Sequence, residues 1–296
     1  MGTHVIAVVG ATATGKSGLA IELARALGGE IVNADSMQLY QDMDIGTAKE
    51  LEAARQGVPH HLLDIWPVTQ AANVADYQKL ARAAIDEIIA RGRVPILAGG
   101  SGLYVRAALD DLDFPGTDPV IRSRLEDELA RLGAAALHAR LAGLDPAAAA
   151  AILPGNGRRI VRALEVIEIS GRPFSATMPA YQQNRPAVQI GLTLPRPELD
   201  RRIAARVDRM WQAGLEAEVR SLAAQGLRDG QTASRALGYQ QMLRYLDGEW
   251  TLDQAREETM KATRRFARRQ ESWFRPTPAS AGSTPPAALC SPPRPP

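Results

Sequence analysis

The stretch Val5-Ile6-Ala7-Val8-Val9-Gly10-Ala11-Thr12-Ala13-Thr14-Gly15-Lys16-Ser17 decides the fold of this chain. An apolar strand runs directly into the pattern G-x-x-x-x-G-K-S, and leucines at 19, 23 and 27 indicate a helix after it, so the sequence predicts a P-loop. Converging backbone N–H groups in such a loop bind phosphate oxygens, Lys16 adds a cation, and the Ser17 hydroxyl is offered to Mg²⁺. The loop alone is compatible with transfer, hydrolysis or release of the phosphate. The residues expected to bind it are Gly10, Ala11, Thr12, Ala13, Thr14, Gly15, Lys16 and Ser17.

The charge and cysteine content favour a cytoplasmic protein. In 296 residues, 35 Lys and Arg against 33 Asp and Glu give a net charge of +2, so affinity for nucleic acid has to come from local clusters. A single cysteine, Cys290, excludes an internal disulfide and a cysteine-based zinc site. No apolar run is long enough to span a membrane, and no segment resembles a dimer seam. We expect a cytoplasmic monomer without membrane contact.

Two further apolar runs, residues 30–33 and 94–98, are predicted strands of the same parallel sheet. The first leads to Asp35 and the second to Ser101, at the sheet edge where ligands bind in open α/β folds. A carboxylate and a hydroxyl facing a P-loop can deprotonate and orient an incoming amine or alcohol, although both residue types also cap helices. Residues 94–98 end in Gly-Gly-Ser-Gly, without the Asp that holds Mg²⁺ in most P-loop enzymes that transfer a γ-phosphoryl group.

The order of the predicted elements gives an α/β fold, with a P-loop NTPase-like parallel sheet core, a helical insertion domain and a helical C-terminal segment. Residues 1–114 form the first part of the core, and residues 115–186 lack a strand pattern and form the insertion. Residues 187–275 return to the sheet through a strand at 188–194 and continue as helices. Residues 276–296 are rich in proline and are expected to be disordered. Helix starts are predicted at Asn73, Asp118, Asp145 and the capping box Thr251-x-x-Gln254.

The last predicted helix is basic. Between Arg256 and Arg275, seven Lys and Arg stand against three Glu. Charges alone are compatible with a solvated helix face and with a face that binds nucleic acid. The basic residues that share one face of this helix are Lys261, Arg264, Arg265 and Arg268. By contrast, His60 and His61 are adjacent in a short strand, and we expect them to be structural and not metal ligands.

Blocks of sequence along most of the chain resemble the bacterial tRNA dimethylallyltransferases. They run in the family's order from residue 5 to about residue 275. Two departures are conservative, since Ala11 stands where proline is usual and Ser101 stands where threonine is common. The blocks are the P-loop, Asn33-Ala34-Asp35-Ser36-x-Gln38-x-Tyr40, Met43-Asp44-Ile45-Gly46-Thr47-Ala48-Lys49, Pro59-His60-His61-Leu62-Leu63-Asp64, Gly99-Gly100-Ser101-Gly102-Leu103-Tyr104, Arg159 to Val166, Arg235-Ala236-Leu237-Gly238-Tyr239-Gln240, and Thr263 to Phe274.

This resemblance implies transfer of a dimethylallyl group from dimethylallyl diphosphate to N6 of adenosine 37, just 3′ of the anticodon, in tRNAs that read codons beginning with U. The P-loop then holds the diphosphate of the prenyl donor, with Mg²⁺ on Ser17, and Arg235 assists it. Asp35 and Ser101 are the implied catalytic residues. The residues implied to contact the tRNA anticodon stem-loop are Asp35, Ser36, Met37, Gln38, Ser101, Arg122, Arg158, Arg159, Arg162, Arg264, Arg265 and Arg268.

Three other functions fit part of the sequence. A P-loop kinase for a small molecule or nucleotide explains the P-loop and Asp35, but it leaves the basic helix unexplained. An adenylate isopentenyltransferase has no need of a clamp for the anticodon arm. A nucleotide-dependent RNA-binding switch needs a sensing loop such as D-x-x-G at a strand end, and we find none.

Overall fold

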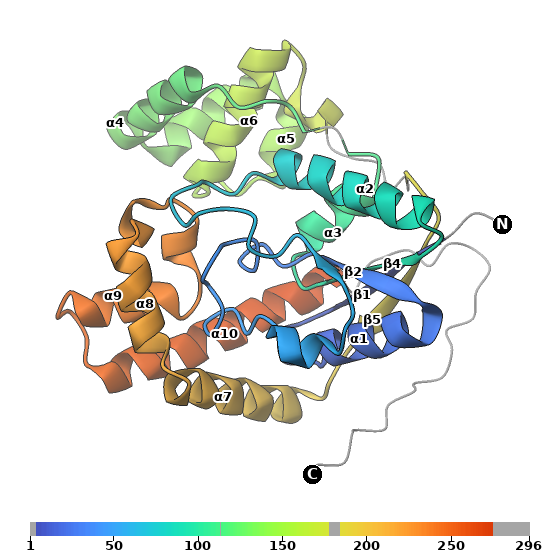
Figure 1. Cartoon of the computed structure of the whole chain (residues 1–296). Helices are drawn as coiled ribbons and strands as arrows, with labels where there is room; N and C mark the ends of the chain where they lie inside the picture. Colours follow the sequence, from blue (N-terminus) through green and yellow to red (C-terminus); the bar gives the residue numbers. More distant parts are fainter. Residues whose placement is uncertain (1–3, 113, 178–183, 275–296) are drawn as a thin grey trace.

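The computed structural model describes residues 4–112, 114–177 and 184–274 and is built on a parallel sheet (Figure 1). The strands in these residues lie in the order β3-β2-β4-β1-β5, and every pairing is parallel. The central strands are apolar and buried because helices cover both faces of the sheet, whereas β5 is a partly exposed edge. The strands are β1 (Val5–Gly10), β2 (Gly29–Asn33), β3 (His60–His61), β4 (Val94–Gly99) and β5 (Ala187–Leu192).

Helices cover the sheet on both sides and make three layers. Successive strand residues point to opposite faces, so Val8 and Ile96 pack with α1 (Lys16–Leu27), while Val9 and Leu97 belong to the larger core on the other face. That core is covered by α2 (Val74–Ala90) and α3 (Gly102–Leu109) (Figure 1). The α/β fold with a P-loop-like parallel sheet is therefore confirmed.

A lobe of helices stands beyond α2 and has a core of its own (Figure 1). The side chains of Leu125, Leu141 and Leu164 are fully buried within this lobe and belong to an apolar cluster separate from those on the sheet. The boundaries at residues 115 and 186 stay predictions. The lobe contains α4 (Pro119–Leu144), α5 (Pro146–Ala151), α6 (Gly157–Ser170) and the short 3₁₀ helix η2 (Phe174–Thr177).

The predicted helix starts are confirmed by their capping bonds. The side chain of Asn73 accepts from the backbone N–H of Ala75 at 2.8 Å and opens α2. Asp118 and Asp145 cap α4 and α5 in the same way. The capping box at residues 251–254 has both of its reciprocal bonds.

The chain after β5 is helical up to residue 274. The helix that ends at Leu246 begins only at Tyr239, because Ala236 is extended and Gly238 has a φ of 88°. The predicted disorder of 276–296 falls outside the described residues. No helix in the described part of the chain is long and apolar enough to cross a membrane. The helices of this segment are α7 (Arg196–Gln212), α8 (Leu215–Ala224), α9 (Tyr239–Leu246) and α10 (Leu252–Phe274), with η3 (Leu227–Asp229) and η4 (Ala233–Arg235) between them, while η1 (Glu52–Arg55) precedes β3.

Candidate active site

The P-loop joins β1 to α1 in a conformation that its small residues permit. Gly10 has a φ of 146°, and a Cβ at this position would lie 2.5 Å from the carbonyl oxygen of Leu192 in β5, so only glycine fits. Ala13 also has a positive φ of 64°. The Lys16 ammonium donates to the carbonyl of Ala11 at 2.6 Å, which folds this cation back over the loop. The loop therefore presents a cation and a helix start on one side.

Two neighbouring cavities open at the P-loop. The first, of about 90 Å³, lies at the carboxyl end of the sheet and is lined by Thr12, Lys16, Ser17, Asp35 and Gln38, among others. The second, of about 410 Å³, is lined by the P-loop and the start of α1 together with three arginines of α7. Lys16, Ser17, Glu50 and Arg206 line both cavities.

The end of β2 holds Asp35 at the first cavity. The backbone N–H of Asp35 donates to the side chain of Asn33 at 2.9 Å, and Asn33 also donates to the carbonyl of Leu62 at 3.0 Å. One carboxylate oxygen of Asp35 accepts from the backbone N–H of Met37 at 3.0 Å. Asp35 therefore stands in a fixed turn, with the rest of its carboxylate available to the cavity that it lines.

Ser101 lies beside this turn at the end of β4. Its hydroxyl accepts from the backbone N–H of Ser36 at 3.3 Å and lies 3.4 Å from the Ser36 hydroxyl. Ser101 is the residue before α3, yet its side chain makes no capping bond to that helix. The structure thus brings Asp35, Ser36 and Ser101 to one edge of the sheet, and β4 ends without a carboxylate, as the sequence indicates.

Arg206 of α7 is a site residue that the sequence analysis missed. It donates to the carbonyl of Thr47 at 2.9 Å and faces the same cavities as Lys16. Burial lowers the pKa of Lys16 to about 8; Asp35 opposes this shift and Arg206 adds to it. Burial also lowers the pKa of Arg206. Two desolvated cations facing one carboxylate favour the binding of an anion between them.

The predicted diphosphate residue Arg235 lies elsewhere. It is exposed at the end of η4 and is not among the residues that line either cavity. A signal for Arg206 was present, since Arg202, Arg206 and Arg209 recur at helical spacing and all line the second cavity.

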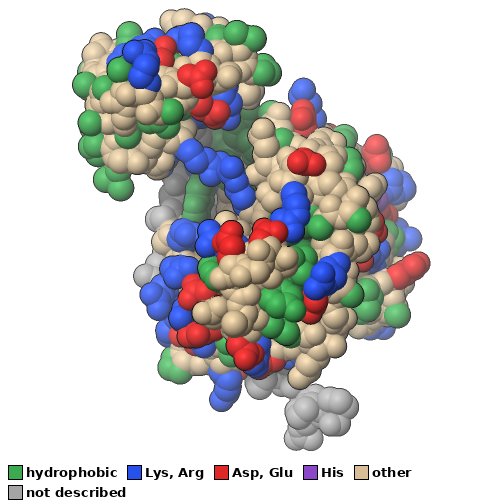
Figure 2. Space-filling model, turned by 90° about the vertical axis from the view of Figure 1, so that its left-hand side faces the viewer, with side chains coloured by type: hydrophobic (Ala, Val, Ile, Leu, Met, Phe, Trp, Pro, Cys, Tyr) green, Lys and Arg blue, Asp and Glu red, His purple; other side chains and the backbone are tan. Residues whose placement is uncertain are grey.

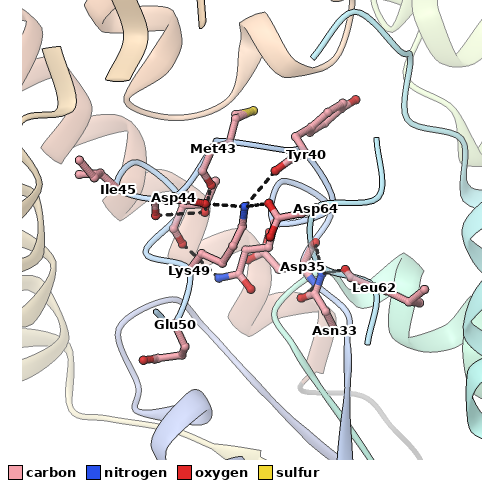
Figure 3. Close-up of polar contacts among 12 residues, drawn as sticks. Asn33, Asp35, Tyr40, Met43, Asp44, Ile45, Lys49, Glu50, Leu62 and Asp64 are labelled. Carbon is pink, nitrogen blue, oxygen red and sulfur yellow. Dashed lines mark hydrogen bonds and ion pairs between the residues drawn. The ribbon is translucent and has the colours of Figure 1, made fainter. Parts of the chain in front are cut away.

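The loop between β2 and β3 closes one side of the site. Figure 3 shows its anchor: the ammonium of Lys49 donates to the carbonyl of Tyr40 at 2.9 Å and to the carboxylates of Asp44, at 2.7 Å, and Asp64. The Lys49 side chain is only 3% exposed. Within the same loop, the side-chain amide of Gln38 donates to the carbonyl of Thr47 at 3.2 Å. Residues 42–50 therefore approach the crevice, and Ala48 and Glu50 form part of its wall.

All but one of the arginines predicted to contact tRNA fall into two groups. Arg122 and Arg162 both pair with the fully buried carboxylate of Glu165, and Arg162 also donates to the carbonyl of Pro115 at 2.6 Å. They therefore hold the segment that enters the helical lobe. The exposed arginines, without an ion pair in the described part of the chain, are Arg158, Arg159, Arg265 and Arg268.

Arg264 belongs to neither group, since it is half-buried and lies 3.9 Å from the carboxylate of Asp200. Figure 2 shows Lys and Arg side chains gathered around the hollow between the helical lobe and the body. His61 pairs with Glu30 at 2.6 Å, whereas the ring of His60 lies 2.8 Å from the carbonyl of Val58 and lines the first cavity. A structural role without metal binding stays a prediction for both histidines.

Comparison with known proteins decides the family. A family model described as IPP transferase matches residues 38–277. The chain belongs to the IPP transferase family. Because the match begins after the P-loop, the loop is an observation independent of it.

Relatives and solved structures of the family cover nearly the whole chain. The tRNA dimethylallyltransferase of Thermobifida fusca is 70% identical over 279 residues, which are 93% of this chain and 88% of the relative. That of Streptomyces coelicolor is 68% identical over 275 residues, with the same two coverages. The tRNA isopentenylpyrophosphate transferase of Bacillus halodurans is 44% identical, with a TM-score of 0.67 over 93% of this chain and 88% of that one. A eukaryotic dimethylallyltransferase acting on tRNA gives a TM-score of 0.80 at 27% identity, over 92% of this chain and 69% of that one.

Proposed function

We propose that this chain transfers a dimethylallyl group from dimethylallyl diphosphate to N6 of adenosine 37 in tRNAs that read codons beginning with U. The observation that carries the proposal is one cavity in which Lys16, Arg206 and the P-loop face Asp35, in a chain of the IPP transferase family. The names of its relatives support a tRNA substrate over a metabolite kinase. We further propose that the protein acts in the cytoplasm as a monomer.

The P-loop side of the cavity stabilises the leaving group. The N6 nitrogen forms a bond to the allylic carbon as that carbon's bond to the diphosphate oxygen breaks, and the electron pair leaves on the diphosphate. Lys16, Arg206 and the loop amides face this developing charge from a partly dehydrated site, where fixed cations are most effective. This chemistry needs no carboxylate at the end of β4, because no phosphoryl group is transferred.

The Asp35 side of the cavity receives the nucleophile. Asp35 accepts a proton from N6 or orients the amine through a hydrogen bond, and Ser101 helps to position it. Mg²⁺ fits the remaining donors: the Ser17 hydroxyl lines both cavities, and Mg²⁺ is commonly held by substrate phosphates, water and only one or two protein groups. When bound there, Mg²⁺ would neutralise charge on the diphosphate.

The tRNA has to deliver its adenine out of the anticodon-loop stack, which costs a few kcal/mol. Basic side chains around the hollow between lobe and body offer a surface for the phosphates of the anticodon arm (Figure 2). Arg158 and Arg159 of the lobe and Arg265 and Arg268 of α10 are the exposed candidates. An enzyme that makes a free prenylated nucleotide, such as an adenylate isopentenyltransferase, has no use for such a surface.

One assay separates the candidate functions. The protein is incubated with Mg²⁺, either dimethylallyl diphosphate or ATP, and either unmodified tRNA or AMP, and the products are analysed by mass spectrometry. We expect prenyl mass on adenosine 37 of tRNA alone. Prenyl mass on AMP alone would identify an adenylate isopentenyltransferase, and phosphate transfer from ATP would identify a kinase; either result overturns the proposal.

A further inference from the structure

Gln270 is a buried amide on the inner face of the basic helix α10. Its side chain is 5% exposed and lines the first cavity. The carbonyl oxygen of this amide accepts from the backbone N–H of Thr12 at 2.8 Å, and its nitrogen donates to the carbonyl of Gly100 at 2.9 Å. Both ends of one side chain are therefore engaged with the two halves of the site.

These two partners come from the elements that the transfer has to align. Thr12 is part of the P-loop, and Gly100 immediately precedes Ser101 at the end of β4. Because Gln270 spans them, it sets the separation between the loop that binds the diphosphate and the edge that receives the nucleophile. The mechanism above assigns no role to this residue.

The surroundings of Gln270 leave little freedom. A Cβ at Gly100 would lie 2.2 Å from the amide nitrogen of Gln270 and 3.2 Å from the carbonyl of Gly10. Glutamate would offer only acceptors when ionised, and it would put a negative charge beside the diphosphate. Only an amide of this length supplies both the donor and the acceptor.

We propose that Gln270 is a positioning residue, which holds the P-loop and the Ser101 edge at the separation that the transfer requires. This inference rests on the proposed prenyl transfer. Reactions between bound groups depend on their alignment, and a displacement of about 1 Å can cost about 10²-fold in rate. Gln270 also joins the P-loop to the helix whose opposite face carries Arg265 and Arg268, so the same helix serves both substrates.

The test measures single-turnover transfer with enzyme in excess, because such rate constants do not depend on the active fraction of the protein. We expect Gln270→Met to lower the rate constant by about 10²-fold, while the affinity for an anticodon stem-loop changes by less than about twofold because the outer face of α10 is intact. Gln270→Glu should raise the KM for dimethylallyl diphosphate more than Gln270→Met does. The matched control is Gln240→Met on α9, which removes an exposed glutamine and should leave the rate constant, the stem-loop affinity and the KM unchanged.

A double-mutant cycle with Gly100→Ala tests the contact itself. Gly100→Ala should displace the Gln270 amide and slow the transfer, yet cost at least tenfold less in a Gln270→Ala background. Independent, multiplicative effects would overturn the proposal, as would a single-turnover rate constant of Gln270→Met within twofold of wild type. Should Gln270→Met not fold, Gln270→Glu and Gly100→Ala carry the same comparison. Absence of prenyl transfer by the wild-type protein would instead refute the proposed function.

Discussion

The P-loop edge and the helical lobe use arginine in opposite ways. In the lobe, Arg122 and Arg162 both form ion pairs with the buried carboxylate of Glu165, so their charges are compensated within the fold. At the P-loop, Arg206 donates to a backbone carbonyl and has no ion pair among the described residues. An arginine without a carboxylate partner, placed beside a phosphate-binding loop, is available to a ligand. Position and partner, more than residue type, separate the binding arginines from the structural ones.

Removing the charge of Asp35, the carboxylate that faces Lys16 and Arg206, should have the largest effect on the rate of transfer. We expect Asp35→Asn to slow the transfer by about 10²- to 10⁴-fold, because the incoming amine loses its proton acceptor. Rapid-quench measurement with saturating substrates checks this. Asp42→Asn is the matched control, since Asp42 is exposed in the same segment. Equal rates for Asp35→Asn and Asp42→Asn would exclude Asp35 from the chemistry.

The lobe can be tested through Glu165. We expect Glu165→Gln to lower the free energy of unfolding by about 3 kcal/mol, the low end for breaking a buried pair, since Arg122 and Arg162 still reach solvent. The two arginines hold the pKa of Glu165 below its usual value against the effect of burial. Stability from this group is therefore present above the pKa of the unfolded carboxyl, and it is lost as pH falls through the lower folded value.

Urea denaturation at neutral and acid pH measures both effects. Glu128→Gln, in the more exposed pair with Arg140, should cost less than about 1 kcal/mol. If both variants lost the same stability, Glu165 would not be the structural anchor of the lobe.

Substitutions of arginines on the outer face of α10 should have smaller effects, which depend on salt, on the affinity for tRNA. We expect Arg265→Gln and Arg268→Gln each to weaken tRNA binding and to make the dependence of log affinity on log salt shallower by about 0.7 to 0.9 per lost phosphate contact. Filter binding over a range of salt concentrations measures this slope. Lys261→Gln is the comparison, because Lys261 already pairs with Glu257 at 2.8 Å. An unchanged slope in all three variants would remove α10 from the tRNA interface.

The smallest predicted effect concerns pH. Lys16 attracts the diphosphate only when it is protonated, and burial lowers its pKa to about 8. The affinity for inorganic diphosphate should therefore fall as pH rises through 8. From pH 7 to pH 9 the loss should be about tenfold at most, because the proton uptake of one group limits it. Calorimetry at both pH values checks this: the ratio of the affinity of wild type to that of Lys16→Met should fall by up to about tenfold between pH 7 and pH 9, and taking this ratio removes the titration of diphosphate itself.

The features that the sequence predicted well are local ones. The P-loop follows from eight consecutive residues, and the caps at Asn73, Asp118 and Asp145 follow from hydrogen bonds between neighbours. Asp35 and Ser101 could be placed because parallel strands bring their carboxyl ends to one edge.

Arg206 and Gln270 could not be found in this way, because they reach the site only when α7 and α10 pack beside the sheet. The spacing of Arg202, Arg206 and Arg209 indicates one helix face but not what that face contacts, and the partners of Arg206 and Gln270 are backbone groups, which the sequence does not identify. The pairing of Arg122 and Arg162 with Glu165 is equally long-range and could not be predicted, and their contact with tRNA stays a prediction. Arg235 as a diphosphate ligand stays a prediction.

The central contrast, a ligand-binding arginine at the P-loop against a structural arginine in the lobe, is tested most directly by calorimetric binding of inorganic diphosphate. Wild type, Arg206→Gln and Arg162→Gln are compared, with the melting temperature of each. We expect Arg206→Gln to weaken binding by about 10- to 100-fold, the value of a charge-assisted hydrogen bond, without loss of stability. Arg162→Gln should bind diphosphate as wild type does and melt at a lower temperature. Unchanged affinity in Arg206→Gln, or an equal loss in Arg162→Gln, would contradict the account.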